Sequence, residues 1–287
     1  MIRLRNFIMK VALIMILLLS TGCQNQEQKP NNNQEKEVQM MNKNGTTLQT
    51  RILVPSGYKR TQNQGLTKFL REYSLKEDGS PVLLYDGSEK GNQNAHIAVM
   101  KLPLENKDLQ QCADSIMRIY AEYYYHNQQY DKISFHFVNG FEAKYFKWRQ
   151  GYSISVDGNT TKWIKTSKDH TTYQSFQKYL GIVFSYASTL SMEKESTKIS
   201  LSQIQVGDVF LKSGSPGHVV MIVDICENEN GQKAFLLAQG YMPAQEFHIL
   251  KNPKHESDPW YYENEVVYPF TTPQYTFEEG SLRHLKY

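Results

Sequence analysis

The alternation of apolar and polar residues divides the chain into three parts. The first holds an uninterrupted apolar run at residues 11–19, which is too short for a membrane-spanning helix of about 20 residues. A tract rich in Gln, Asn, Lys and Glu follows and fills most of residues 23–44. It has too few apolar residues to offset the entropy of ordering, so we expect a disordered tether. Apolar periodicity then predicts a single folded domain over residues 45–287.

Short strands are expected on both sides of the helices in the first two-thirds of this domain. Residues 47–54, 81–87 and 96–104 each read as a strand, and residues 66–75 as a short helix. Residues 148–166 predict a hairpin with Asp157-Gly158 at its turn, because this dipeptide favours tight hairpin connections.

Two longer helices are predicted between and after these strands. Over residues 109–126 the apolar residues recur every three or four positions, which is typical of an amphipathic helix. Asp108, with Gln111 three residues later, would form its capping box. Residues 172–194 predict a second long helix.

The last third changes to closely spaced strands. Residues 207–214, 218–225, 233–241 and 246–250 are four strand-like runs, which predict an antiparallel meander. Helices followed by a sheet indicate an α+β fold. The Pro- and Tyr-rich segment after residue 252 is expected to wrap the surface.

Charge excludes one class of function. The chain has 32 Lys and Arg against 29 Asp and Glu, and its first 22 residues hold three of the basic residues and none of the acidic ones. The remainder is therefore balanced, at 29 against 29. No basic run provides an electrostatic footprint, so we predict no nucleic-acid partner.

The basic start, the short apolar run and the sequence Ser-Thr-Gly before Cys23 indicate a signal peptide over residues 1–22. Residues 20–23, Ser-Thr-Gly-Cys, resemble a bacterial lipobox, which implies that Cys23 is lipidated and attaches the chain to a membrane. Gln24 is not the Asp that resembles an inner-membrane retention signal. We therefore expect an outer-membrane lipoprotein that faces the periplasm or the cell surface.

Two cysteines remain, Cys112 and Cys226. In an oxidising compartment they could form a disulfide, or each could be a buried thiol, since free Cys behaves as a small apolar residue.

Cys112 is also the candidate nucleophile. It lies in the first turn of its predicted helix, where unpaired N–H groups and the helix dipole favour a thiolate. His218 follows a Gly- and Pro-rich loop and opens a strand, and pairing with the next strand brings Gln239 opposite or diagonal to it. A thiol, an imidazole and a polar group that orients the imidazole are the components of nucleophilic catalysis.

Other residues compete for these roles. Glu246 or His248 on the following strand could replace Gln239. Asp208, Asp224 and Cys226 are interpreted as structural. His96 and His136 occur on strands, but no His-Glu-x-x-His or Cys-x-x-Cys spacing supports a metal site, and no cofactor is predicted.

Residues 207–225, "GDVFLKSGSPGHVVMIVDI", are similar to the Gly-Asp-strand-loop-Gly-His-strand passage of papain-like cell-wall peptidases of the NlpC and CHAP types. This likeness covers about residues 105–126 and 200–252. It implies a papain-like arrangement in which a helix with Cys at its N-terminus packs on an antiparallel sheet, with N-terminal strands and a helical and hairpin insertion.

Over nearly its whole length the chain looks like a group of Bacteroides lipoproteins that share domain of unknown function 4846. The motifs that carry this likeness are "QCADSIMRIYAEYYY", "GSPGHVVMIVD" and "LLAQGYMPAQEFHIL".

Together these features predict an envelope cysteine hydrolase, an endopeptidase or amidase, with Cys112 as nucleophile, His218 as base and Gln239 as orienting residue. A tethered lipoprotein near the murein makes peptidoglycan peptides the natural substrate. The alternative is an inactive lipoprotein that binds peptide, glycan or a partner protein. The sequence leaves the oligomeric state open.

Overall fold

A computed structural model describes residues 40–166 and 170–287 of the chain. The described residues belong to one compact unit. The predicted signal peptide, the predicted lipidation site Cys23 and most of the predicted tether lie outside the described residues. None of the helices that the structure describes is both long and apolar enough to cross a membrane.

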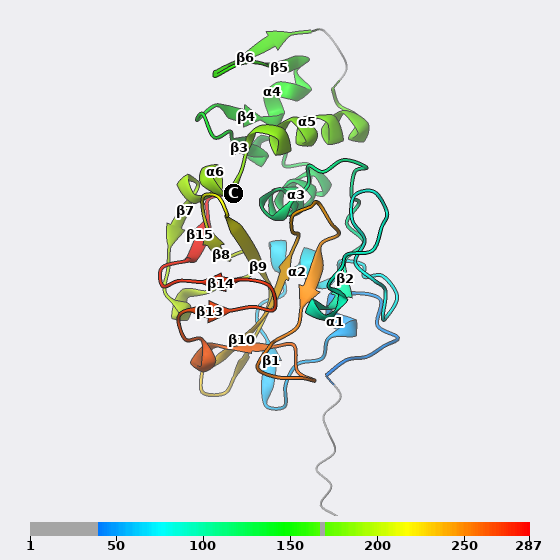
Figure 1. The fold of residues 1–287 in the computed structure, drawn as a ribbon, viewed down its shortest axis with the longest axis vertical. Helices are drawn as coiled ribbons and strands as arrows, with labels where there is room; N and C mark the ends of the chain where they lie inside the picture. The colour runs from blue at the N-terminus through cyan, green and yellow to red at the C-terminus, as the bar shows by residue number, and fades with distance from the viewer. Residues whose placement is uncertain (1–39, 167–169) are drawn as a thin grey trace, which may run out of the picture. The chain divides into compact units, whose positions relative to one another are not determined.

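The described residues have an α+β fold built on a nine-stranded antiparallel sheet (Figure 1). Its main path runs β2-β11-β10-β9-β8-β15-β7, with β1 paired to β9 and β12 paired to β10. The bounds of these strands are β1 Tyr58–Arg60, β2 His96–Val99, β7 Ser196–Lys198, β8 Val209–Lys212, β9 His218–Asn228, β10 Lys233–Gln239, β11 His248–Leu250, β12 Tyr261–Tyr262 and β15 Leu282–Leu285. The predicted meander is confirmed as β8 to β11.

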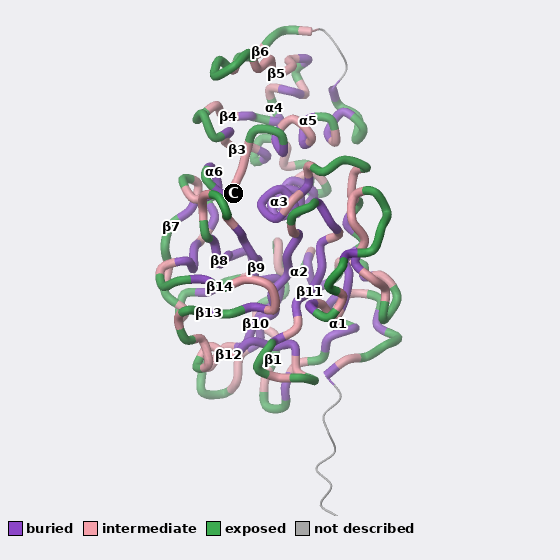
Figure 2. Tube along the Cα trace, in the orientation of Figure 1, coloured by how far each residue is buried: buried purple, intermediate pink, exposed green. Residues whose placement is uncertain are grey.

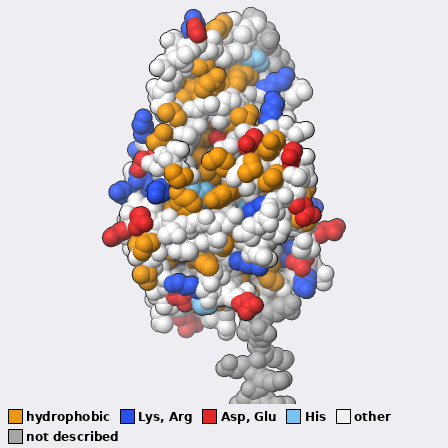
Figure 3. Space-filling model, viewed as in Figure 1, with side chains coloured by type: hydrophobic (Ala, Val, Ile, Leu, Met, Phe, Trp, Pro, Cys, Tyr) orange, Lys and Arg blue, Asp and Glu red, His pale blue; other side chains and the backbone are white. Residues whose placement is uncertain are grey.

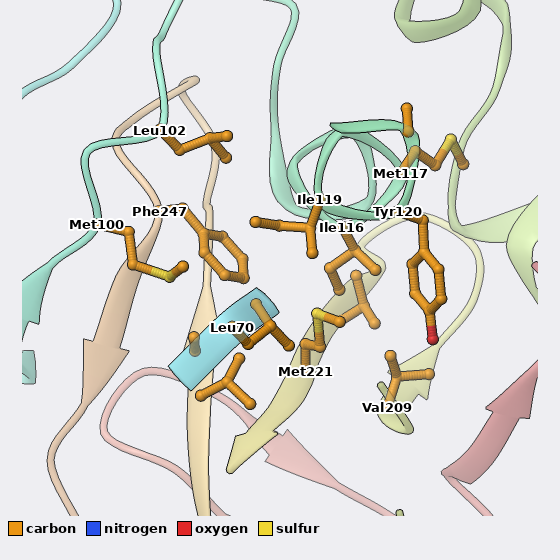
Figure 4. Packing of buried hydrophobic residues seen from close by; sticks show 14 of the residues in the cluster. Leu70, Met100, Leu102, Ile116, Met117, Ile119, Tyr120, Val209, Met221 and Phe247 are labelled. Atoms are coloured by element: carbon orange, nitrogen blue, oxygen red, sulfur yellow. The ribbon is translucent and has the colours of Figure 1, made fainter. Parts of the chain in front are cut away.

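Each face of the sheet carries its own hydrophobic core. On one face, side chains of β9 and β10 pack against α3 (Cys112–His126) and α2 (Gly65–Arg71). Figure 4 shows Ile116 and Ile119 of α3 directed toward Met221 of β9, with Leu70 of α2 nearby. On the other face, a second cluster includes Phe270 and Phe277 from the C-terminal segment. Both central strands are therefore buried on two sides, as their continuous apolar runs predict.

The long helix α3 is buried even on its polar side. Residues 112–122 are all buried, and α3 is shown as largely buried in Figure 2. Arg118 pairs with Glu122 at 2.6 Å, and the hydroxyl of Tyr173 donates to the same carboxylate at 2.7 Å. Tyr173 begins α5 (Tyr173–Tyr186). The predicted amphipathic periodicity is correct, but α5 covers the face that a solvent-exposed helix would leave to water.

The remaining elements form smaller units. Two hairpins and the helices α4 and α5 gather beyond α3 in Figure 1. The hairpin predicted around Asp157-Gly158 is confirmed, because Asp157 pairs with Thr160. The bounds of the other elements are α1 Leu48–Arg51, β3 Ser134–His136, β4 Glu142–Lys144, α4 Tyr145–Arg149, β5 Tyr152–Asp157, β6 Thr160–Lys165, α6 Thr189–Lys194, β13 Phe270–Thr271 and β14 Thr276–Phe277, with four short 3₁₀ helices at Gln93–Ala95, Tyr130–Lys132, Leu201–Gln203 and Glu263–Glu265.

Three predictions about the N-terminal and central elements were wrong. Residues 47–54 contain helix α1 instead of a strand, because Thr50 Oγ1 accepts the N–H of Thr47 at 3.0 Å and closes a local turn. Residues 81–87 make isolated bridges, such as Leu84 with Gln245, and no strand. The second long helix is broken into α5 and α6, because Ser188 caps the new helix through the N–H of Leu190.

The C-terminal segment does not simply wrap the surface. Its last strand, β15, lies inside the sheet, where it pairs with β8 on one side and β7 on the other. On the face drawn in Figure 3, basic and acidic side chains are interspersed around the margins while hydrophobic side chains gather in the middle.

Candidate active site

The helix that carries Cys112 begins at this residue, not at residue 109. Gln111 is its N-cap, and Asp114 Oδ2 accepts the Gln111 N–H at 3.0 Å. The predicted cap, Asp108, instead accepts the N–H of Ala244, a residue far along the chain, at 2.6 Å. Cys112 therefore occupies the first helical position, where backbone N–H groups have no partner within the helix.

The Cys112 side chain is almost fully buried, with 8% of the residue exposed. Burial, followed by the nearby Asp114 carboxylate, raises the pKa of the thiol to about 11. Backbone N–H groups of Ala113 and Val219 act in the opposite direction. At neutral pH the thiol is protonated in the free protein. Reactive cysteines, by contrast, usually have pKa values lowered to about 3.5–7.5.

His218 is the first residue of β9 and lies among aromatic rings. Its ring centroid is 4.6 Å from that of Tyr241 and 4.8 Å from that of Tyr275. Burial lowers the pKa of the imidazole to about 4, so the ring is neutral at pH 7. Its Nε2 lies 2.7 Å from Oε1 of Gln239, which ends the neighbouring strand β10.

A polar chain behind Gln239 determines which nitrogen of His218 carries the proton. Lys90 Nζ, which can only donate, lies 2.7 Å from Gln274 Oε1. Gln239 Nε2 donates to the same oxygen at 2.8 Å. The Oε1 of Gln239 is therefore the atom that faces His218, and as an acceptor it requires a proton on Nε2. We assign the Nε2–H tautomer to His218, which leaves Nδ1 free to accept a proton.

The two alternatives to Gln239 have other partners. His248 Nδ1 donates to the carbonyl of Glu246 at 2.8 Å, and its Nε2 lies 3.5 Å from Lys90 Nζ. Burial lowers the pKa of His248 well below its usual value. The Glu246 carboxylate pairs with Lys76 at 2.5 Å. His248 therefore belongs to the polar chain, whereas Glu246 contributes only its backbone.

Cys112 and His218 are neighbours through the backbone rather than through a hydrogen bond. Among the described residues, no hydrogen bond joins the thiol to the imidazole. The thiol instead faces the N–H of Val219, which directly follows His218. Tyr241 lies against the imidazole ring, and the pKa of its hydroxyl is raised by burial and then by Cys112. The thiol and the imidazole thus lie in the same region of the fold, between the start of α3 and the start of β9.

A cavity of about 290 Å³ opens beside the thiol. Its walls come from the start of α3, the segment joining α5 to α6, the loop before β9 and the exposed side chain of Met242. Gly217, the residue before His218, is part of the wall. The cavity therefore leads from the surface to Cys112 and to the peptide segment that carries the imidazole.

A close backbone approach holds α3 against the end of β10. A Cβ atom on Gly240 would lie 2.5 Å from Ser115 Oγ and 3.0 Å from the carbonyl oxygen of Gln111. Only glycine fits there without a shift. Gly240 directly follows Gln239, so the same approach sets the distance between the Cys112 helix and the orienting residue.

The other residues singled out in the sequence have structural contacts. Asp224 binds Arg60 at 2.7 Å and Arg71 at 2.6 Å. Asp208 lies 2.7 Å from His284. Cys226 is buried within β9, and both it and Cys112 are free, so the two do not form the disulfide that the sequence left open.

No set of three His, Cys, Asp or Glu residues in the described ranges is grouped so that it could hold a metal ion. His96, on β2, lies 5.9 Å from the His248 ring, measured between centroids. The ring of His136 contacts Glu195 at 2.7 Å.

Sequence reasoning missed four residues of this site: Lys90, Gln274, Tyr241 and Tyr275. Tyr241 lies within the motif at residues 236–250, but no role was assigned to it there. Lys90 occurs in no recognised motif, and Gln274 and Tyr275 are in a segment expected to wrap the surface. Only the folded chain brings Lys90 and Gln239 to the same amide oxygen, that of Gln274.

No curated protein and no solved structure matches the chain. One family model, described as Domain of unknown function (4846), matches residues 48–284. That range includes both central strands, α3 and every residue of the candidate site. The chain therefore belongs to the family of proteins that contain this domain.

Proposed function

We propose that this protein is a cysteine hydrolase of the cell envelope, an endopeptidase or amidase with a papain-like arrangement of its active residues. Cys112 is the nucleophile, His218 the general base and Gln239 the residue that orients the imidazole. The observation that carries this proposal is the contact of 2.7 Å between His218 Nε2 and Gln239 Oε1, which leaves Nδ1 as the acceptor of an imidazole in the same region of the fold as a thiol at the start of a helix.

The proposed reaction follows from these groups. The Cys112 sulfur attacks the carbonyl carbon of an amide as His218 Nδ1 takes the thiol proton. N–H groups at the start of α3 stabilise the negative oxygen. The imidazolium then gives its proton to the leaving amine, which departs as the C–N bond breaks. Water then attacks the thioester carbonyl carbon while His218 takes its proton, and the C–S bond breaks as the imidazolium returns this proton to the Cys112 sulfur. The products are a carboxylic acid and an amine, and the free thiol is restored.

The neutral state of the free thiol and imidazole is the specific observation that favours a second candidate. Because no hydrogen bond joins the two groups in the described residues and the thiol pKa is about 11, the same cavity would suit a protein that only binds peptide or glycan. In the hydrolase, substrate must bring the two groups into contact, as contacts in free enzymes are often loose.

Location is the second part of the proposal. The signal-like residues 1–22 and Cys23 suggest a lipid anchor in the outer membrane, with the domain reaching peptidoglycan peptides through its tether. Growth with a labelled fatty acid tests this: we expect label on the chain, and none on a Cys23→Ala variant. Equal labelling of both would contradict the anchor.

The catalytic proposal is tested on purified peptidoglycan by measuring the release of free amines. We expect the wild-type chain to release amines, Cys112→Ala to release none and Cys226→Ala, which also removes a buried thiol, to act like the wild type. Release that survives Cys112→Ala would overturn the assignment of the nucleophile. If the wild type releases nothing but still binds peptide, the binding function is the correct one.

A further inference from the structure

A second cavity adjoins the one beside Cys112. Its volume is about 510 Å³, and its walls come from α5, from the segment before α3 and from Trp148 of α4. Leu109 and Ser185 line both cavities. The two cavities therefore meet at these two residues, and together they form a groove that leads from the thiol along one side of α5.

The α5 side of the groove is a single stripe of the helix. Its residues recur every three or four positions, which places them on one face. They are Gln174, Gln177, Lys178, Gly181, Ile182 and Ser185. Eleven residues separate the first from the last, so at 1.5 Å per helical residue the stripe is about 16 Å long. An extended peptide advances about 3.3 Å per residue, so the stripe matches about five of its residues.

Gly181 leaves the middle of the groove open. A Cβ atom at this position would meet one atom outside its own helix, Glu105 Oε2 at 3.8 Å, which is an ordinary contact distance. Because Glu105 also lines the groove, this Cβ position points into it. Glycine in a helix interior costs about 1 kcal/mol relative to alanine. The residue that stabilises α5 least is thus the one that keeps the groove free of side chain.

The end of the groove far from the thiol favours an acidic group. Lys107 and Lys178 are exposed there, and neither forms an ion pair with a described residue. Glu105 is the one carboxylate that lines the second cavity. Two ammonium groups against one carboxylate give this end a net positive charge. Asp108 lies at the other end, beside the thiol, so an acidic group is favoured only at the far end.

The lining of the groove suits a peptide better than a glycan. Its aromatic residues are Trp148 and Phe184, of which only 4% and 5% are exposed, so no broad ring face is open for a sugar to pack against. Gln174 and Gln177 instead present side-chain amides, which both donate to and accept from a peptide backbone.

We propose that the groove binds an extended peptide of at least five residues, with an acidic side chain held by Lys107 and Lys178 and the bond to be cut beside Cys112. This inference rests on the proposed function, for which it defines the class of substrate. A single amide or a dipeptide would occupy only the cavity beside the thiol.

The test measures binding, so that it does not depend on hydrolysis. The probes are three capped peptides: acetyl-Glu-Ala-Ala-Ala-Ala-Glu-amide, the same hexapeptide with Gln in place of both Glu residues, and acetyl-Ala-Ala-amide. An acidic residue at each end allows the hexapeptide to bind in either direction. Calorimetry measures the affinity of each probe for the full chain carrying Cys112→Ala.

We expect the acidic hexapeptide to bind at least tenfold more tightly than the dipeptide, because only the hexapeptide spans both cavities. We expect it to bind about two- to fivefold more tightly than the Gln hexapeptide, which is the usual contribution of one exposed ion pair.

Gly181→Leu in the Cys112→Ala background should remove the advantage of the hexapeptide, because the added side chain fills the groove, and should leave the affinity for the dipeptide unchanged. Leucine is a better helix former than glycine, so α5 is preserved, and a thermal melt checks that the variant is folded. Gly91→Leu is the matched control. Its Cβ position has nothing within 4 Å and it lines neither cavity, so all three affinities should stay the same.

Replacement of both Lys107 and Lys178 by Met should abolish the preference for Glu over Gln and keep the advantage of length. Lys101→Met, at an exposed position outside the groove, should change neither.

Three outcomes would overturn the groove: equal binding of hexapeptide and dipeptide, no binding of any probe at millimolar concentration, or an advantage of length that survives Gly181→Leu. Equal binding of the Glu and Gln hexapeptides, or a preference that survives the double lysine replacement, would overturn the acidic specificity.

The release of amines from peptidoglycan by the wild type is measured separately. If release is absent while the advantage of the hexapeptide depends on Gly181, the hydrolase proposal fails and the groove stands. If release is present and the hexapeptide has no advantage, the groove fails and the hydrolase stands.

Discussion

Nε2 of His218 lies 2.7 Å from Oε1 of Gln239, and this contact links the first residue of β9 to the last residue of β10. In this contact His218 is the donor and Gln239 is the acceptor. Gln239 Nε2 donates to Gln274 Oε1, which Lys90 also contacts, so the Oε1 of Gln239 is the atom that remains for His218. A buried lysine thus controls the proton position on an imidazole that it does not touch.

Replacement of Lys90 by Met should loosen this control. The change removes the donor at 2.7 Å from Gln274 Oε1 while keeping a side chain of similar length. A hydrogen bond to a charged group contributes about 1.5–3 kcal/mol, so we expect amine release to fall roughly tenfold. Nitrogen chemical shifts of the His218 ring should show a mixture of tautomers in place of Nε2–H alone.

Lys101→Met is the matched control for this prediction, since Lys101 is exposed and has no place in the polar chain. It should leave both the tautomer and the rate unchanged. An Nε2–H tautomer that persists fully in Lys90→Met would show that Gln239 is oriented by other contacts.

The reactivity of Cys112 should increase steeply with pH. A thiol pKa of about 11 means that the thiolate fraction at pH 7 is about one in ten thousand. Because deprotonation is required for alkylation, the rate with iodoacetamide should rise about tenfold per pH unit above pH 7. Mass spectrometry of the modified peptides measures each cysteine separately. A rate that is already constant between pH 6 and 8 would indicate a preformed thiolate and contradict this prediction.

Asp114→Asn should shift the same alkylation profile toward lower pH, since the Asp114 carboxylate contributes to the raised thiol pKa. Cys226 is an internal control. It is fully buried, and burial followed by the charge of Asp224 raises its thiol pKa above the usual value, so it should stay unmodified while the protein is folded.

Gly240→Ala should damage both stability and activity. The added methyl group would meet Ser115 Oγ at 2.5 Å and force the start of α3 away from β10. Overpacking of this kind costs about 1–3 kcal/mol, which urea denaturation measures. Gly91→Ala is the matched control, because nothing lies within 4 Å of its Cβ position. Equal stability of the two variants would mean that α3 can move without cost.

Asp224→Asn should lower the free energy of unfolding by about 3–5 kcal/mol, the usual cost of breaking a buried ion pair. The fully buried carboxylate binds both Arg60 and Arg71, and Arg71 is itself only 1% exposed. Urea denaturation measures this loss. If the dependence of the unfolding free energy on urea concentration is unchanged, the variant has lost stability while the surface exposed on unfolding stays the same. Asp131→Asn, at an exposed position, should have little effect. A loss below 1 kcal/mol would show that the Asn side chain still satisfies both arginines.

The local pattern of apolar and polar residues was sufficient to predict those helices and strands that depend on residues close together in the sequence. The periodicity of residues 109–126 and the apolar runs of β9 and β10 predicted these elements and their order. The same pattern placed His218 and Gln239 on adjacent strands, because the short connection between β9 and β10 makes them an antiparallel pair. Where a local hydrogen bond outweighs strand propensity, as at Thr47 and Thr50, the prediction was wrong.

By itself, then, the sequence determined the class of fold, the meander and the identity of the candidate thiol and imidazole, since these depend on spacing and residue type. Only the tertiary structure decided the rest. Distant contacts moved the start of α3 from residue 109 to Cys112, because Asp108 is engaged by Ala244. They also brought Lys90 and Gln274 behind Gln239. Burial and hydrogen bonding between distant segments depend on the whole packing, so no local pattern encodes them.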